Sequence, residues 1–64
     1  MVKDRDLSFI GVGENFVRKE EYEPVYFVPY LFVGAVLQEM KQRSDLKDKA
    51  LVYSYKHSCY LVIK

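Results

Sequence analysis

The sequence predicts an α+β fold in which one amphipathic helix, over about residues 29–43, packs on one face of a small, mostly antiparallel sheet of three to five strands. Short segments rich in β-branched and aromatic residues recur along the chain, separated by Gly, Pro, Asn or charged residues, as is typical of strands. In one segment only, the apolar residues follow the spacing of a helix. With 64 residues, the chain is expected to form a single compact domain, residues 1–64.

The first two strands are expected before Pro24. Residues 7–12, LSFIGV, form a short apolar run with alternation that predicts a strand. Residues 13–15, GEN, follow as a turn, because glycine and asparagine tolerate the backbone conformations that turns require. Residues 16–22, FVRKEEY, are expected to return as a second, half-exposed strand, and the charged RKEE block places that strand at the periphery.

The densest apolar stretch is VYFVPYLFVGAVL, residues 25–37. Residues 25–28 predict a strand, and Pro29 suits the first turn of a helix because it has no N–H to pair there. From Pro29 the apolar residues follow a helical period, with Phe32, Val36 and Met40 at i, i+4 and i+8, which indicates about four helical turns. A membrane span needs about 20 apolar residues, so we expect this stretch to lie in the core and not in a membrane.

Two further strands are expected at the C-terminal end, over residues 50–55 and 58–64. Lys56 and His57 lie between them, and this pair is a poor choice for a tight two-residue hairpin turn. The segment is therefore either a hairpin or one long, bent strand. The predicted core consists of apolar residues from all these elements: Leu7, Phe9, Ile10, Val25, Phe27, Phe32, Val33, Val36, Leu37, Met40, Leu51, Leu61 and Ile63.

The composition argues against metal centres and cofactors. One cysteine rules out a disulfide within the chain, and one histidine leaves too few ligands for a structural zinc site. The N-terminus has no apolar run typical of a signal peptide, so we expect a cytoplasmic protein. Six Tyr and four Phe residues are a heavy aromatic load for so small an interior, and such residues are enriched where two protein surfaces meet.

Catalysis is not expected. His57 and Cys59 would share a face of a continuous strand, and a Cys–His pair can stabilise a thiolate, but the sequence indicates no group that orients them. The GVGEN segment, residues 11–15, lacks the third glycine or the Lys-Ser/Thr pair of a phosphate-binding loop, so a plain turn is the better interpretation. The acids at Glu20, Glu21 and Glu23 form a charged run typical of a solvated surface.

Two classes of binding protein remain. The first is a protein-interaction module, expected to be a homodimeric regulator or inhibitor that acts by binding a partner protein. Its expected interface residues are Tyr26, Tyr30, Tyr53, Tyr60 and Val62. An apolar C-terminal strand, CYLVI, would support this class if it lay at a sheet edge and paired with another chain.

The alternative is a nucleic-acid-binding protein, in which tyrosines stack on bases while nearby cations hold phosphates. Its candidate residues are Lys41, Arg43, Lys47, Lys49, Tyr55 and Lys56. The formal net charge of +1 is small for this function, and the glycine-punctuated aromatic signature of RNA-recognition strands is absent. We therefore rank protein binding first.

Overall fold

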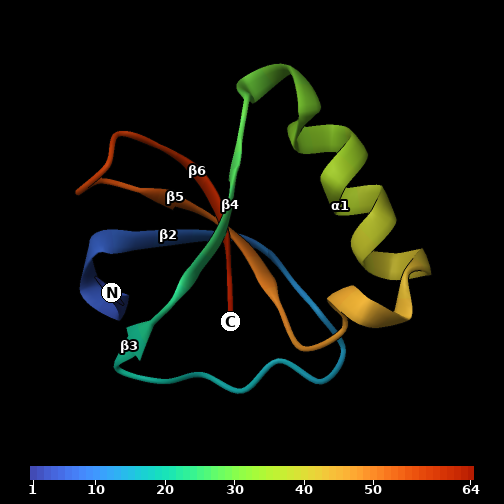
Figure 1. The fold of residues 1–64 in the computed structure, drawn as a ribbon, viewed down its shortest axis with the longest axis horizontal. Coiled ribbons are helices and arrows are strands. Elements are labelled where there is room, and N and C mark those ends of the chain that lie inside the picture. Colours follow the sequence, from blue (N-terminus) through green and yellow to red (C-terminus); the bar gives the residue numbers. More distant parts are fainter.

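The computed structural model describes residues 1–64 and confirms the α+β class (Figure 1). The elements, with η for 3₁₀ turns, are β1 (Val2–Lys3), η1 (Asp4–Asp6), β2 (Leu7–Val12), β3 (Glu21–Tyr22), β4 (Pro24–Val28), η2 (Tyr30–Phe32), α1 (Val33–Gln42), η3 (Ser44–Leu46), β5 (Ala50–Ser54) and β6 (Cys59–Ile63). The helix packs to one side of the sheet, and β3 and the N-terminus lie at the opposite side (Figure 1).

The main sheet has four antiparallel strands in the order β2-β5-β6-β4, and β1 and β3 form a separate two-stranded ribbon. Strand β6 therefore lies inside the sheet, paired on both sides, and its CYLVI sequence offers no free edge. The free edges belong to β2 and β4. Strand β4 is the edge that continues directly into η2 and α1, so it positions the surface described below.

Both faces of the sheet are covered, which explains why β5 and β6 are apolar at nearly every position. One hydrophobic cluster lies on the β1–β3 side and consists of Val2, Leu7, Tyr22, Ala50, Val52, Leu61 and Ile63. The other lies under α1 and consists of Val28, Met40, Leu46, Leu51 and Val62. Alternate residues of β5, such as Leu51 and Val52, enter opposite clusters because successive side chains of a strand point to opposite faces.

The predicted core is confirmed in part. The confirmed buried residues are Leu7, Met40, Leu51, Leu61 and Ile63. Four more pack partly buried against the two clusters: Phe9, Val33, Val36 and Leu37. The prediction was wrong for Ile10, Phe27 and Phe32, which are exposed. Ile10 and Phe27 lie on the two edge strands, and Phe32 lies in η2 before the helix begins, so neither core cluster covers them.

The helix is shorter than its sequence pattern predicts. Pro29 has extended geometry, with φ −60° and ψ 144°, and precedes η2 instead of starting an α-helix. The Phe32 N–H donates to the Pro29 carbonyl oxygen at 2.8 Å, and α-helical geometry begins at Val33 and ends at Gln42. Residues 30–32 therefore project past the end of β4. None of the helices has both the length and the hydrophobicity that a membrane span requires.

Two other segments settle questions that the sequence raised. The predicted strand over residues 16–22 was wrong except at Glu21–Tyr22, which pairs with β1. Residues 50–63 form a hairpin, with residues 55–58 as the turn. The buried Ser54 Oγ accepts a hydrogen bond from the His57 N–H at 3.2 Å, and Ser58 has a positive φ of 53°, so a four-residue turn accommodates Lys56 and His57.

Candidate functional site

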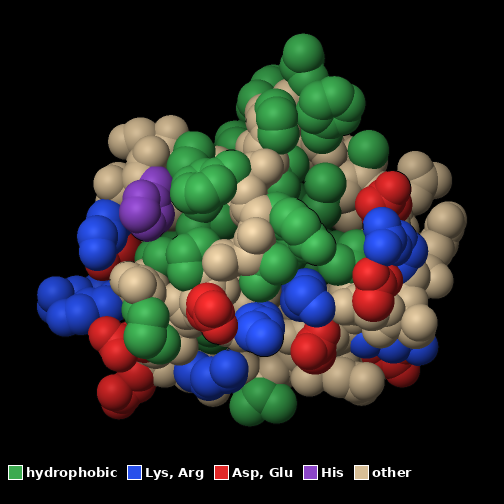
Figure 2. All heavy atoms as spheres, viewed as in Figure 1, with side chains coloured by type: hydrophobic (Ala, Val, Ile, Leu, Met, Phe, Trp, Pro, Cys, Tyr) green, Lys and Arg blue, Asp and Glu red, His purple; other side chains and the backbone are tan.

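The most unusual surface of this chain is apolar. Five large side chains at the end of β4 and in η2 are exposed by 58–88%: Tyr26, Phe27, Tyr30, Leu31 and Phe32. We call this set the β4–η2 face. Hydrophobic side chains run from η2 down over β4, and charged side chains gather at the margins (Figure 2). No charged residue occurs from residue 24 to residue 38.

Local backbone structure explains why these side chains are exposed. Phe27 pairs with Leu61 of β6, but it lies on the outermost strand, beyond the reach of the cluster that covers Leu61. Its ring contacts only the turn residue His57 among aromatic groups, with 6.1 Å between ring centroids. Pro29 then directs the chain into η2, beyond the sheet, where Leu31 has no element above it and is 88% exposed.

A groove of about 260 Å³ runs beside this face, between β4 and α1. Val36, Leu46 and Val62 contribute apolar surface to it, and Tyr26 and Phe32 of the β4–η2 face also line it. Its charged lining residues are Glu39, Arg43 and Asp45. The groove therefore combines apolar surface with a few polar groups, as ligand and hot-spot pockets do. We call it the β4–α1 groove.

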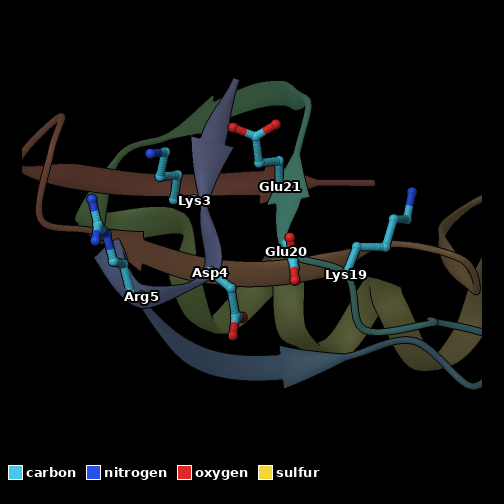
Figure 3. A pocket seen from close by; sticks show the side chains of 6 residues that line it. All are labelled: Lys3, Asp4, Arg5, Lys19, Glu20 and Glu21. Atoms are coloured by element: carbon cyan, nitrogen blue, oxygen red, sulfur yellow. The ribbon is translucent and has the colours of Figure 1, made fainter.

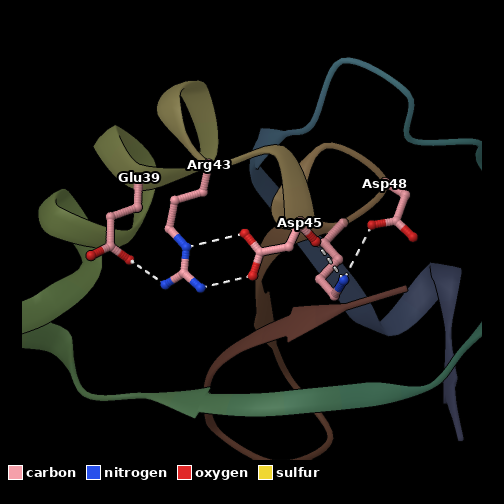
Figure 4. A network of polar contacts seen from close by, with 5 residues as sticks. Glu39, Arg43, Asp45 and Asp48 are labelled. Carbon is pink, nitrogen blue, oxygen red and sulfur yellow. Dashed lines mark hydrogen bonds and ion pairs between the residues drawn. The ribbon is translucent and has the colours of Figure 1, made fainter.

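The polar end of the groove is held by an ion-pair network (Figure 4). Arg43 makes a bidentate contact with Asp45, from Nε to Oδ1 at 3.1 Å and from Nη2 to Oδ2 at 2.7 Å. Its Nη1 lies 3.7 Å from Glu39 Oε2. The hydrogen bond from Arg43 lowers the pKa of the Asp45 carboxyl below its ordinary value of 3.8, and Lys49 lowers the pKa of Asp48 in the same way.

These pKa shifts predict a small loss of stability in acid. A carboxyl whose pKa is lower in the folded state stabilises the protein above its unfolded pKa, and this stabilisation disappears as the pH falls through the folded pKa. We therefore expect the urea concentration at the unfolding midpoint of the native chain to decrease when the pH is lowered below about 4. The decrease should be smaller in Asp45→Asn. Urea titrations of both proteins at about pH 7 and pH 3 measure the difference. Equal acid sensitivity would show that the pair does not affect stability.

The predicted nucleic-acid residues do not form one surface. Lys41, Arg43, Lys47 and Lys49 lie around the end of α1 and η3, whereas Tyr55 and Lys56 lie in the β5–β6 turn, at the other end of the long axis (Figure 1). Three of the cations pair with acids: Arg43 with Asp45, Lys47 with Glu14 at 3.6 Å, and Lys49 with Asp48 at 3.2 Å. This neutralisation reduces the attraction for phosphates.

The candidate catalytic residues, His57 and Cys59, lie in different environments. His57 is exposed in the turn beside Phe27, and Cys59 packs against the cluster on the β1–β3 side. The structure contains no group of three or more His, Cys, Asp or Glu side chains arranged to hold a metal ion.

A second hollow, of about 560 Å³, opens beside the β1–β3 ribbon. Its lining is entirely charged and consists of Lys3, Asp4, Arg5, Lys19, Glu20 and Glu21. The three cations and three acids cancel, and their side chains spread outward without converging on a common point (Figure 3). This arrangement gives neither an apolar contact nor a field of one sign, so we regard it as a solvated surface.

The predicted interface residues fall into two groups. Tyr26 and Tyr30 belong to the β4–η2 face. Tyr53 and Tyr60 are half-buried against each other, with 5.0 Å between ring centroids, and Val62 is only 2% exposed beneath the groove. Sequence reasoning missed Leu31 and assigned Phe27 and Phe32 to the core. One signal was available for Leu31, because it does not share the helical spacing of Phe32, Val36 and Met40.

In comparisons with known proteins, the chain matches no protein-family model, no curated protein and no solved structure.

Proposed function

We propose that this chain is a small, non-catalytic protein-binding module, and that the β4–η2 face is its working surface. The observation that carries the proposal is the exposure of Tyr26, Phe27, Tyr30, Leu31 and Phe32 around a free strand edge, with Tyr26 on one side of it and Phe27 on the other. Exposed apolar patches of this kind mark protein–protein interaction sites. Such a module acts as a regulator or inhibitor does, by covering a surface of the partner protein.

Three properties of the surface support protein as the ligand. Aromatic residues dominate it, and large aromatic side chains are enriched at interfaces and at binding hot spots. The β4–α1 groove offers a hollow into which an apolar side chain of a partner fits. The unpaired backbone of β4 can accept a strand from another chain, because every second N–H and C=O group of an edge strand has no partner within its own sheet.

Site-specific photocrosslinking in the natural host cells tests this proposal. A benzophenone amino acid replaces Tyr30 in one variant and Val17 in the other, because both side chains are similarly exposed, at 75% and 68%, and Val17 lies outside the β4–η2 face. We expect a discrete adduct of higher mass from position 30 and none from position 17. Peptide mass spectrometry of the adduct identifies the partner. Absence of any adduct at position 30, or equal labelling at both positions, would contradict the proposal.

A further inference from the structure

The outer edge of β4 points to a specific partner. We propose that the β4–η2 face binds a second copy of this chain, through antiparallel pairing of β4 with β4 of the copy about a two-fold axis at Tyr26. The inference rests on the proposed function, because it assigns the occupant of the same surface. It makes one sheet of eight strands from two copies of the four-stranded sheet.

The hydrogen-bonding pattern of β4 leaves the backbone N–H and C=O groups of Phe27 free to pair with another strand. Glu23 and Lys64 exchange two backbone hydrogen bonds, at 3.3 and 3.2 Å. Because hydrogen-bonded and non-hydrogen-bonded pairs alternate along an antiparallel ladder, the register across the bulge directs the N–H and C=O groups of Tyr26 and Val28 toward β6. The same alternation directs the N–H and C=O groups of Phe27 outward, away from the sheet.

A two-fold axis at Tyr26 pairs the free groups of Phe27 with Val25, the residue that the bulge leaves without a partner in β6. It places Phe27 opposite Val25 of the copy, and Val28 opposite Pro24 of the copy. Prolines limit the pairing at both ends, since neither Pro24 nor Pro29 has an N–H to donate. The pairing is therefore short and its register is defined. The contact is isologous, so the same residues serve both copies.

Charge distribution favours a second copy over an unrelated strand. Edge strands that avoid association usually carry charged residues, especially lysine, but β4 and η2 carry none. Pairing this surface with itself brings no like charges together. The surface also has a protrusion, formed by Tyr30 and Leu31, and a hollow, the β4–α1 groove. Antiparallel pairing about Tyr26 places Tyr30 and Leu31 of each copy beside Tyr22 and Glu21 of the other, just before the start of its β4.

The exposed apolar area sets an upper bound on what a dimer could bury, and this bound is close to the size of a standard interface. An aromatic side chain buries about 150–250 Å² when it is fully covered, so four that are 58–75% exposed offer on the order of 500 Å² per copy. Leu31 and the strand backbone add to this area, which approaches the roughly 800 Å² per partner of a standard interface. A chain this small also gains from the extra burial, because alone it buries only about 60% of its unfolded surface.

Sedimentation equilibrium tests the dimer, with the native chain expected at twice its mass of 7.6 kDa. Leu31→Glu places a negative charge in the β4–η2 face, beside Glu20 and Glu21 of the copy, and we expect it to raise the dimer dissociation constant roughly tenfold or more, as loss of a hot spot does. Val12→Glu, at a 58% exposed site on β2, the opposite edge strand of the sheet, should leave the dimer intact. Circular dichroism confirms that both variants remain folded. A native monomer, or a dimer equally unaffected by both changes, would overturn the inference.

A disulfide across the axis tests the register independently. Residues at a non-hydrogen-bonded antiparallel position have Cα atoms about 4.5 Å apart, which a disulfide can span. In a Cys59→Ala background, we expect Tyr26→Cys to form a covalent dimer rapidly on mild oxidation and Val17→Cys to remain monomeric. Equal rates at both positions would refute pairing at Tyr26. If the Tyr30 photocrosslink gave only an adduct with a different protein, self-pairing would fail while the proposed function would survive.

Discussion

Replacing Tyr22 by alanine is expected to remove a large part of the protein's stability. Tyr22 has no exposed surface, and its ring stacks on Phe16 and contacts the edge of Phe9, with centroid distances of 5.7 and 5.9 Å. Truncating a buried aromatic side chain to alanine costs about 3–5 kcal/mol. A chain of this length has a total stability of roughly 3–10 kcal/mol, so this change would remove between about a third and all of it.

A second change at the same position separates the contribution of the Tyr22 ring to stability from that of its hydroxyl. The Tyr22 hydroxyl accepts a hydrogen bond from the Lys19 N–H at 2.8 Å and donates one to Asp4 Oδ1 at 3.4 Å. Tyr22→Phe leaves both groups without this partner, and we expect a loss of about 1–2 kcal/mol. Urea denaturation followed by circular dichroism measures both variants, with the exposed Val17→Ala as control, expected within about 0.5 kcal/mol of the native chain. A Tyr22→Ala variant as stable as this control would contradict the assigned core.

Tyr22 also shows where sequence reasoning stops. The strands at residues 7–12 and 25–28 and the two C-terminal strands could be predicted because period-two patterns and β-propensity are local properties. The burial of Tyr22 depends on its pairing with Val2, twenty positions away in the chain, across a ribbon of two-residue strands. No local pattern records that contact, and the neighbouring charged residues indicate exposure instead. The sequence therefore predicted the central strands correctly and missed one side of the core.

The same limit applies to the candidate site. Tyr26 and Tyr30 were expected at an interface because aromatic residues exceed what the interior needs, and both are exposed. Phe27 and Phe32 were expected in the core, because an apolar side chain on a strand or helix is usually buried. The exposure of Phe27 follows from the strand order, which places β4 at the edge and β6 inside, whereas Phe32 is exposed because it lies in η2, before the helix begins. Strand order is set by contacts between distant segments, so it could not be derived from local spacing.

The second large effect is expected at Gly13, where alanine should destabilise the protein by about 1–3 kcal/mol, the usual cost of overpacking. A Cβ atom at this position would overlap the Lys47 carbonyl oxygen and would lie 2.6 Å from that of Leu46. These are backbone atoms and cannot rotate away as a side chain can. The Lys47 carbonyl is also fixed, because it accepts a hydrogen bond from the Asn15 N–H at 2.7 Å.

Gly34 provides the matched control, because the same substitution should have the opposite sign there. A Cβ atom at Gly34 meets nothing within 4 Å, and the residue lies exposed in the first turn of α1. Alanine is the better helix former and restricts the unfolded chain, so Gly34→Ala should stabilise by about 0.4–1 kcal/mol. Urea midpoints of the two variants should therefore move in opposite directions from that of the native chain.

The comparison also tests what the GVGEN segment does. The Gly13 N–H already donates to the Lys49 carbonyl oxygen at 2.7 Å, and the Asn15 N–H is paired with Lys47. Two of the backbone donors that a phosphate-binding loop would direct at its ligand are thus occupied by the chain itself. The glycine at position 13 is needed because this turn lies directly against the backbone of residues 46–47, with no room for a side chain. If Gly13→Ala were neutral or stabilising, the two backbone segments could not be packed as closely as the structure places them.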